Sequence, residues 1–177
     1  YGGNAAVACY AVISYIVFPV QYFLTGIGEG VQPLISFYHG AKKEMEVRAV
    51  KKIAYTAEII FGITAAAVTI CMIPYIGGWF GLSAESKQCF SSGMLISSFA
   101  FLLTGTAKLN VSCLNAVMQT KKAVFMTYIE SLAVSPICLF LLPAVWDIRG
   151  IWLALPVTAG IMTGIYGLIR KDRKNEE

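Results

Sequence analysis

Two long apolar stretches of the sequence carry polar side chains that repeat along one face of a helix. In both stretches the polar residues are separated by three, four or seven positions. This spacing aligns side chains on a single helix face. The first set is Ser14, Gln21, Thr25, Glu29, Gln32 and Ser36, and the second set is Ser97, Thr104, Lys108, Ser112, Asn115 and Gln119. The sequence therefore predicts two long helices, each with a polar stripe in apolar surroundings.

Two roles account for such stripes. Ser, Thr and Asn side chains commonly form hydrogen bonds between packed membrane helices. Charged and amide groups such as Glu29, Gln32 and Lys108 are costly at membrane depth, and they usually face a bundle interior or a water-filled cavity. These groups favour a hydrated pathway for a substrate or an ion, with hydrogen bonding between helices as the alternative.

Three ionisable residues are predicted to share one depth in the membrane. Lys108 lies 12 residues before the loop at Thr120, and Glu130 lies 10 residues after it, so both are roughly 15–18 Å from that loop in antiparallel helices. Glu29 lies roughly 16 Å before Gly40, the end of its own stretch. Because an unpaired charge is costly there, we predict that Lys108 pairs with Glu130, which leaves Glu29 to bind a proton or a cation. The alternative pairs Lys108 with Glu29 and transfers that role to Glu130.

The composition excludes an ordinary soluble domain. The chain has 177 residues, of which 57% are hydrophobic and 14% charged, and its mean hydropathy is +0.68. Soluble domains are about 45–50% apolar and about 25% charged, and disordered chains are poor in apolar residues. The sequence therefore predicts an all-α polytopic membrane protein.

Five stretches are long and apolar enough to span a bilayer, which requires about 20 residues. Pro19 and Pro33 are expected to kink the first stretch. Glu58 lies near the start of the second stretch, where we expect it to reach the cytoplasmic surface. The last stretch has no charge between Ile151 and Ile169 and is predicted to be structural or lipid-facing. The predicted spans are residues 5–38, 53–76, 90–118, 123–145 and 148–169, followed by a cytoplasmic tail at 171–177.

Basic residues alternate between the two sides of these spans. Of the 14 Lys and Arg residues, 11 follow the first, third and fifth spans, whereas Lys87 and Arg149 follow the second and fourth. The remaining one is Lys108, inside a span. The positive-inside rule then places the N-terminus outside and the C-terminus in the cytoplasm. The tryptophans near the outer connections are predicted to form an aromatic belt or to pack inside the bundle; they are Trp79, Trp146 and Trp152.

Side chains that serve enzymes and metal sites are sparse. No two of the five cysteines are closer than 18 residues, and His39 is the single histidine, so we predict no metal site and no redox chemistry. The glycines between Gly26 and Gly30 lack the ending of a phosphate-binding loop. They form a GxxxG pattern, as do Gly160 and Gly164, and this predicts close approach of helices. We predict no enzyme activity, no cofactor and no nucleic-acid partner.

The end of the first stretch resembles the signature of the multidrug and toxic compound extrusion (MATE) family. In that family the pattern G-x-x-x-G-x-Q-P-[LI]-[IV]-S-[FY]-x-x-G-A closes a long helix before a basic loop. The sequence after Gly26 fits it, and residues 115–122 resemble the turn between helices ten and eleven, with Thr120 where Gly is usual. The residues that carry the main resemblance are Gly30, Gln32, Pro33, Ser36, Gly40 and Ala41.

The resemblance implies a transporter built from two six-helix lobes. Residues 1–170 would form helices eight to twelve of the C-terminal lobe, and the N-terminal lobe would be a further part of the same polypeptide. The implied activity is export of organic cations or other amphipathic compounds across the cell membrane in exchange for protons or sodium, by alternating access. Some members carry an important acid on helix ten, where this chain has Lys108. The principal ion-binding acid is therefore expected in the N-terminal lobe, with Glu29 as an auxiliary candidate.

Two other functions remain open at this stage. A lipid-linked oligosaccharide flippase of the same superfamily would share the two-lobe design. A small membrane scaffold without transport activity would have to assemble with itself to bury both polar stripes. The reading frame upstream of Tyr1 distinguishes these, because a further set of spans there favours the transporter and a nearby start codon favours the scaffold.

Overall fold

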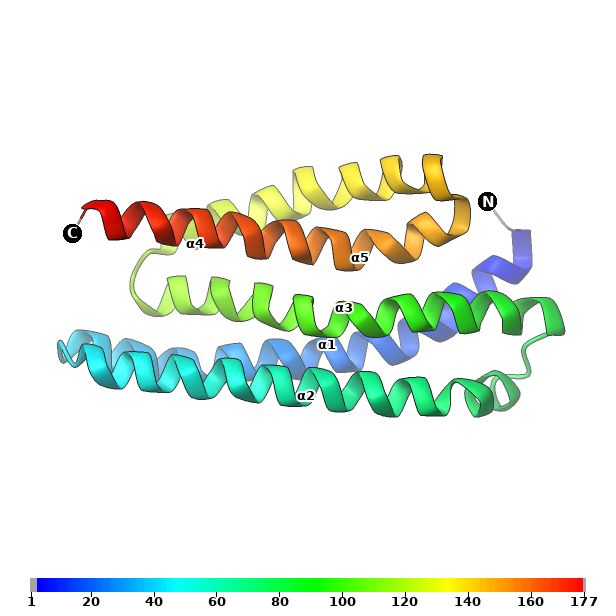
Figure 1. Cartoon of the computed structure of the whole chain (residues 1–177), viewed down its shortest axis with the longest axis horizontal. Coiled ribbons are helices and arrows are strands. Elements are labelled where there is room, and N and C mark those ends of the chain that lie inside the picture. Colours follow the sequence, from blue (N-terminus) through cyan, green and yellow to red (C-terminus); the bar gives the residue numbers. More distant parts are fainter. Residues whose placement is uncertain (1–2, 177) are drawn as a thin grey trace.

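The computed structural model of the chain is a bundle of long helices that run side by side along one axis (Figure 1). It describes the backbone of residues 3–176 and the side chains of residues 6–84 and 86–169. The described part contains no strand. Its elements are α1 (Gly3–Gly40), α2 (Glu44–Trp79), α3 (Ala84–Ala116), α4 (Thr120–Tyr128), the π-helix η1 (Ile129–Val134) and α5 (Ser135–Glu176).

The described chain has four long apolar helical segments and not the five that the sequence predicts. They are Ala6–Gly40, Glu44–Trp79, Ser86–Ala116 and Thr120–Ile169. The last has 50 residues and includes both the fourth and the fifth predicted spans. Within it the backbone leaves helical geometry at Trp146 (φ −120°, ψ 18°) and Asp147 (φ 48°, ψ −135°), and the chain doubles back there (Figure 1). The number of segments is four and not five because only two residues separate the helical turns on either side of this reversal, where the sequence predicts a loop between two separate spans.

Short connections make consecutive helices antiparallel. Residues 41–43, 80–83 and 117–119 join the first four helices, and each connection includes one residue with left-handed backbone. These residues are Lys42 (φ 57°), Gly81 (φ 61°) and Met118 (φ 58°). Such a residue ends a helix sharply because it cannot continue right-handed geometry. The helices also extend past the apolar runs, so that α2 begins at Glu44, well before the predicted start at residue 53.

The two ends of the bundle differ in the connections that they hold. Figure 1 places the N- and C-termini at opposite ends of the long axis. The α1–α2 connection, the α3–α4 connection and the C-terminus lie at one end, and the α2–α3 connection and the reversal at Trp146 lie at the other (Figure 1). The basic clusters therefore gather at one end of the molecule, as their alternation along the sequence requires.

α3 is the central helix and packs against α1, α2 and α5. Its side chains Phe90, Met94 and Phe101 belong to a buried apolar cluster near one end of the bundle. A second cluster around Ile35 and Leu109 joins α1, α2 and α3 near the other end. Many large apolar side chains lie on the outside instead, including Phe23, Ile60, Phe140 and Leu141. An apolar exterior of this extent is suited to lipid and unsuited to water.

Close approach of α1 to α3 occurs at a different glycine from those predicted. Apart from the adjoining residues and backbone of its own helix, a methyl group at Gly26 or Gly30 would have no atom within 4 Å, and the same holds for Gly164. At Gly28 a methyl group would lie 3.0 Å from Oγ of Ser112 and 3.4 Å from Cα of Leu109. A step of two residues turns a helix by about 200°, so Gly26 and Gly30 face away from α3 when Gly28 faces it. The predicted GxxxG contact at Gly26 and Gly30 is therefore absent from the described helices.

Candidate functional site

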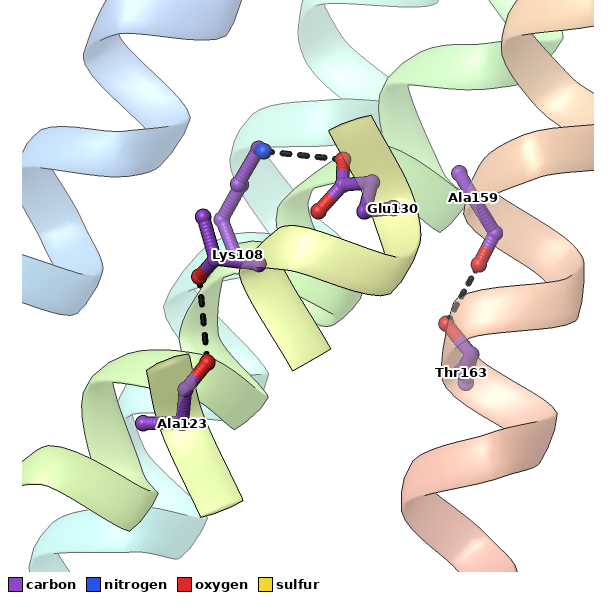
Figure 2. Close-up of polar contacts among 6 residues, drawn as sticks. Lys108, Ala123, Glu130, Ala159 and Thr163 are labelled. Atoms are coloured by element: carbon purple, nitrogen blue, oxygen red, sulfur yellow. Dashed lines mark hydrogen bonds and ion pairs between the residues drawn. The ribbon is translucent and has the colours of Figure 1, made fainter. Parts of the chain in front are cut away.

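Lys108 and Glu130 form an ion pair between α3 and η1. Nζ of Lys108 donates to Oε1 of Glu130 at 2.9 Å (Figure 2). The exposed fractions of the two side chains are 38% and 19%, so the pair is partly buried. This confirms the preferred pairing from the sequence. Glu29 lies exposed on α1 and is not the partner of Lys108.

The π-helix η1 positions the acid of this pair. The backbone N–H of Ser135 donates to the carbonyl of Glu130, five residues earlier, which widens the turn. Pro136 follows directly and has no N–H to donate to the carbonyl of Leu132, so the regular α-helical ladder is interrupted here. π-helical turns inside α-helices occur frequently at functional sites. Sequence analysis missed this element, although Pro136, six residues after an acid at membrane depth, was a usable signal.

A cavity of about 310 Å³ opens beside the ion pair. It lies between α1, α3, η1 and α5, and we call it the central cavity. Four of the predicted pathway residues line it: Gln21, Thr104, Lys108 and Glu130. Ser14 and Ser97 from the two stripes also reach it, and Tyr10, Phe18 and Trp152 supply aromatic surface.

Thr104 lines this cavity and carries a polar atom that the protein itself does not satisfy. The residue is 7% exposed, and its Oγ1 has no hydrogen-bond partner among the described residues. The buried hydroxyl of Ser98 behaves differently, because it donates to the carbonyl of Met94. The more accessible Thr127 and Thr163 likewise donate to the carbonyls of Ala123 and Ala159 (Figure 2). Buried polar atoms are normally paired with protein or ordered water. Oγ1 of Thr104 is therefore an enclosed polar atom beside the central cavity that lacks such a partner.

The half of each stripe nearer the basic end does not line the central cavity. Ser36 Oγ donates to the carbonyl of Ala116 at 2.9 Å, and Ser112 packs against Gly28. These contacts join α1 to α3, so at these two positions the stripe serves helix packing. The pathway role stays a prediction for the four candidates that line the central cavity. It stays a prediction also for those outside it, which are Thr25, Glu29, Gln32 and Asn115.

The structure adds to one prediction and corrects another. The last apolar stretch was expected to be structural or lipid-facing; Trp152 from it is 5% exposed and belongs to the apolar core, and Trp152 and Thr158 also line the central cavity. Glu58 was expected to reach the cytoplasmic surface, yet it is 2% exposed. Because α2 begins at Glu44, Glu58 lies 14 residues inside the helix, roughly 21 Å from its start. Its position follows from the true start of the helix, which the apolar run did not mark.

The free cysteines and the tryptophans divide between core and surface. Cys9, Cys113 and Cys138 are buried, whereas Cys71 is exposed. No group of three His, Cys, Asp or Glu residues in the described part is placed to hold a metal ion. The tryptophans Trp79 and Trp146 are exposed, as a belt requires, but Trp152 is 5% exposed and stacks on Tyr10 with ring centroids 5.6 Å apart.

A hydrogen bond between α2 and α3 leads to a first prediction. The hydroxyl of Tyr55 donates to Oδ1 of Asn110, which is 3% exposed. Tyr55→Phe removes this donor and leaves a buried acceptor without it, so we expect a loss of about 1–3 kcal/mol in stability. The measurement is the thermal unfolding midpoint of the purified full-length protein in detergent. Tyr22→Phe is the matched control, because Tyr22 is 77% exposed; equal losses in both variants would contradict the role of the Tyr55 bond.

Comparison with known proteins places the chain in a family. A family model described as MatE matches residues 1–141. The multidrug export protein MepA of Staphylococcus aureus (strain MSSA476) is 25% identical over 149 residues, which cover 84% of this chain and 33% of the relative. MepA of Staphylococcus saprophyticus is 24% identical over 155 residues, with the same coverage of 84% and 33%. The chain thus spans about a third of the length of these relatives, and no solved structure matches it at a comparable level. Because the family model covers most of the chain, the chain belongs to the MatE family of transporters.

Proposed function

We propose that this chain is part of a multidrug efflux transporter of the cell membrane. The whole protein would export organic cations in exchange for protons or sodium ions, by alternating access of a site between two lobes. Members of this family are transporters rather than enzymes, and relatives are named multidrug export proteins. The observation that carries the proposal is the central cavity, where a mid-helix ion pair meets aromatic and hydroxyl groups.

The chemistry of the central cavity suits an organic cation. Its volume of about 310 Å³ is at the lower end of the range for small-molecule pockets. The carboxylate of Glu130 is already held by an ammonium group, so an incoming cation competes with Lys108 for the same oxygen atoms. Tyr10, Phe18 and Trp152 offer ring faces that attract cations. Exchange of one positive partner for another keeps the acid paired throughout.

The chain would supply helices eight to twelve of the transporter. In this arrangement residues 1–170 form the transmembrane part of the C-terminal lobe, and residues 171–177 form a cytoplasmic tail. An N-terminal lobe of the same polypeptide would close the central cavity from the other side. The gathering of basic connections at one end of the bundle supports a cytoplasmic C-terminus. Glu29 on α1 is the auxiliary candidate for ion coupling, and no cofactor is required.

Transport by the full-length protein in liposomes tests this proposal. A fluorescent lipophilic cation is the substrate, and a pH gradient or a sodium gradient is imposed in separate experiments. We expect one of the two gradients to drive the cation across the membrane in protein-containing vesicles and not in protein-free vesicles. Transfer of a lipid-linked oligosaccharide without cation movement would overturn the proposal in favour of a flippase. If neither compound moves, the non-transporting scaffold becomes the better reading.

A further inference from the structure

One acidic side chain of the described bundle is fully enclosed and has no polar partner. Glu58 lies on α2 and is 2% exposed. Neither Oε1 nor Oε2 has a hydrogen-bond partner among the described residues. The residue does not line the central cavity, so the pathway for an organic cation does not use it.

The space that holds this carboxyl group exists because the facing residue of α3 has no side chain. A methyl group at Gly105 would overlap Oε2 of Glu58. The same methyl group would lie 3.0 Å from Cδ2 of Leu24 on α1. The Glu58 carboxyl group therefore sits where α1, α2 and α3 meet, between a glycine backbone and an aliphatic side chain.

The titratable groups nearest to this site along each packed helix are engaged elsewhere or point outward. On α2 the hydroxyl of Tyr55 donates to Asn110. On α3 the ammonium of Lys108 pairs with Glu130. On α1 both Tyr22 and Glu29 are exposed. No neighbouring charge is therefore placed to neutralise an ionised Glu58.

These observations select the ligand of the site. An isolated carboxylate in apolar surroundings is very costly, whereas a neutral acid costs no more than other buried polar groups. A metal cation requires several oxygen ligands, and no group of three His, Cys, Asp or Glu residues within the described ranges is placed to hold one. A proton needs only the carboxylate itself. The site can therefore accept a proton and has no means of holding a larger cation.

We propose that Glu58 is a proton-binding site, occupied while α1, α2 and α3 are packed as described and emptied when α3 moves away from it. The bound proton forms the O–H bond of a carboxylic acid, and its release to water leaves a carboxylate and a hydrated proton. Release requires water at Oε2, and this is possible only when the contact with Gly105 and Leu24 opens. The site then links the protonation of the lobe to the packing of its central helix. This inference does not rest on the transport of any substrate.

The difference between the infrared spectra of the wild type and Glu58→Gln, both as full-length protein in detergent, tests the site directly. At neutral pH we expect the wild type to show the carbonyl stretching band of a protonated carboxylic acid, and we expect Glu58→Gln to lose that band. Glu46→Gln is the matched control, because Glu46 is exposed near the start of the same helix and should leave the band unchanged. Gln has nearly the shape of a protonated Glu, so the variant should fold. If the wild type and Glu58→Gln show the carboxylic-acid band with the same intensity, Glu58 is ionised and the proposal is overturned.

A second measurement counts the proton. When the folded protein is denatured at neutral pH, Glu58 becomes exposed and ionises, so the wild type should release about one more proton per chain than Glu58→Gln. In Gly105→Ala the carboxylic-acid band of Glu58 should lie at a different frequency from that in the wild type, because the added methyl group displaces the Glu58 carboxyl group. Gly160→Ala should leave this band unchanged, since the added methyl group would lie 3.9 Å from Cδ1 of Leu103 and displace nothing. Equal proton release by the wild type and Glu58→Gln would overturn the assignment.

Discussion

Reversing the charges of Lys108 and Glu130 together should restore transport that either single reversal removes. Lys108→Glu places two carboxylates at the same point of the central cavity, and Glu130→Lys places two ammonium groups there. Breaking a fully buried ion pair costs about 3–5 kcal/mol. The Lys108–Glu130 pair is partly exposed, so the cost of breaking it is smaller. We still expect the transport rate of each single variant to fall more than tenfold, since about 1.4 kcal/mol corresponds to a factor of ten. The double variant keeps one charge of each sign and the same combined side-chain length. We expect its transport rate to recover to within a few-fold of the wild type.

A neutral variant separates a structural role of this pair from a functional one. Replacing both partners of a buried pair with uncharged residues is often harmless to stability. Lys108→Met combined with Glu130→Gln should therefore fold, with an unfolding midpoint close to that of the wild type. We nevertheless expect it to lose transport of cations, because no carboxylate remains in the central cavity to receive them. Full transport by the neutral variant, or a double reversal as inactive as the single ones, would contradict this role of the pair.

The ion pair was predictable from the sequence because it depends only on register. Lys108 and Glu130 lie at nearly equal distances from a tight connection, and antiparallel helices bring such positions level. The polar stripes were visible for the same reason, since helical spacing aligns their members. The family resemblance rested on side chains around Gln32 and Pro33 and likewise needed no tertiary structure. Local and periodic information was sufficient for each of these predictions.

Features that depend on which helix faces meet were out of reach. Glu58 is buried because α2 begins well before its apolar run and turns this face toward Gly105. Gly28 carries the close contact with α3, although Gly26 and Gly30 show the recognised spacing. Thr158 lines the central cavity because α5 folds back along α3 after the reversal. In each case the decisive quantity is the rotation of one helix about its axis, and composition does not specify it.

A large loss of folding stability is expected from Gly93→Ala on α3. At this glycine α1 and α5 both reach the central helix. An added methyl group would lie 2.7 Å from Cε2 of Trp152 and 2.8 Å from Cδ1 of Ile13. Overpacking of a filled core typically costs about 1–3 kcal/mol. We expect a lower unfolding midpoint in the purified full-length protein, and slower cation transport as well, because Trp152 and Ile13 both line the central cavity.

Two further variants test whether the displaced indole ring causes this effect. Gly160→Ala is the control, since a methyl group there would have room and alanine favours the helix over glycine by up to about 1 kcal/mol; its midpoint should not fall. Combining Gly93→Ala with Trp152→Phe supplies space for the methyl group, so the double variant should recover part of the stability that Gly93→Ala loses. Recovery of stability without recovery of transport would indicate that the indole of Trp152, stacked on Tyr10, also serves the cation. If Trp152→Phe only adds its own loss to that of Gly93→Ala, the collision at Trp152 is not the cause, and Ile13 on α1 is then the side chain that limits the approach of α1 to α3.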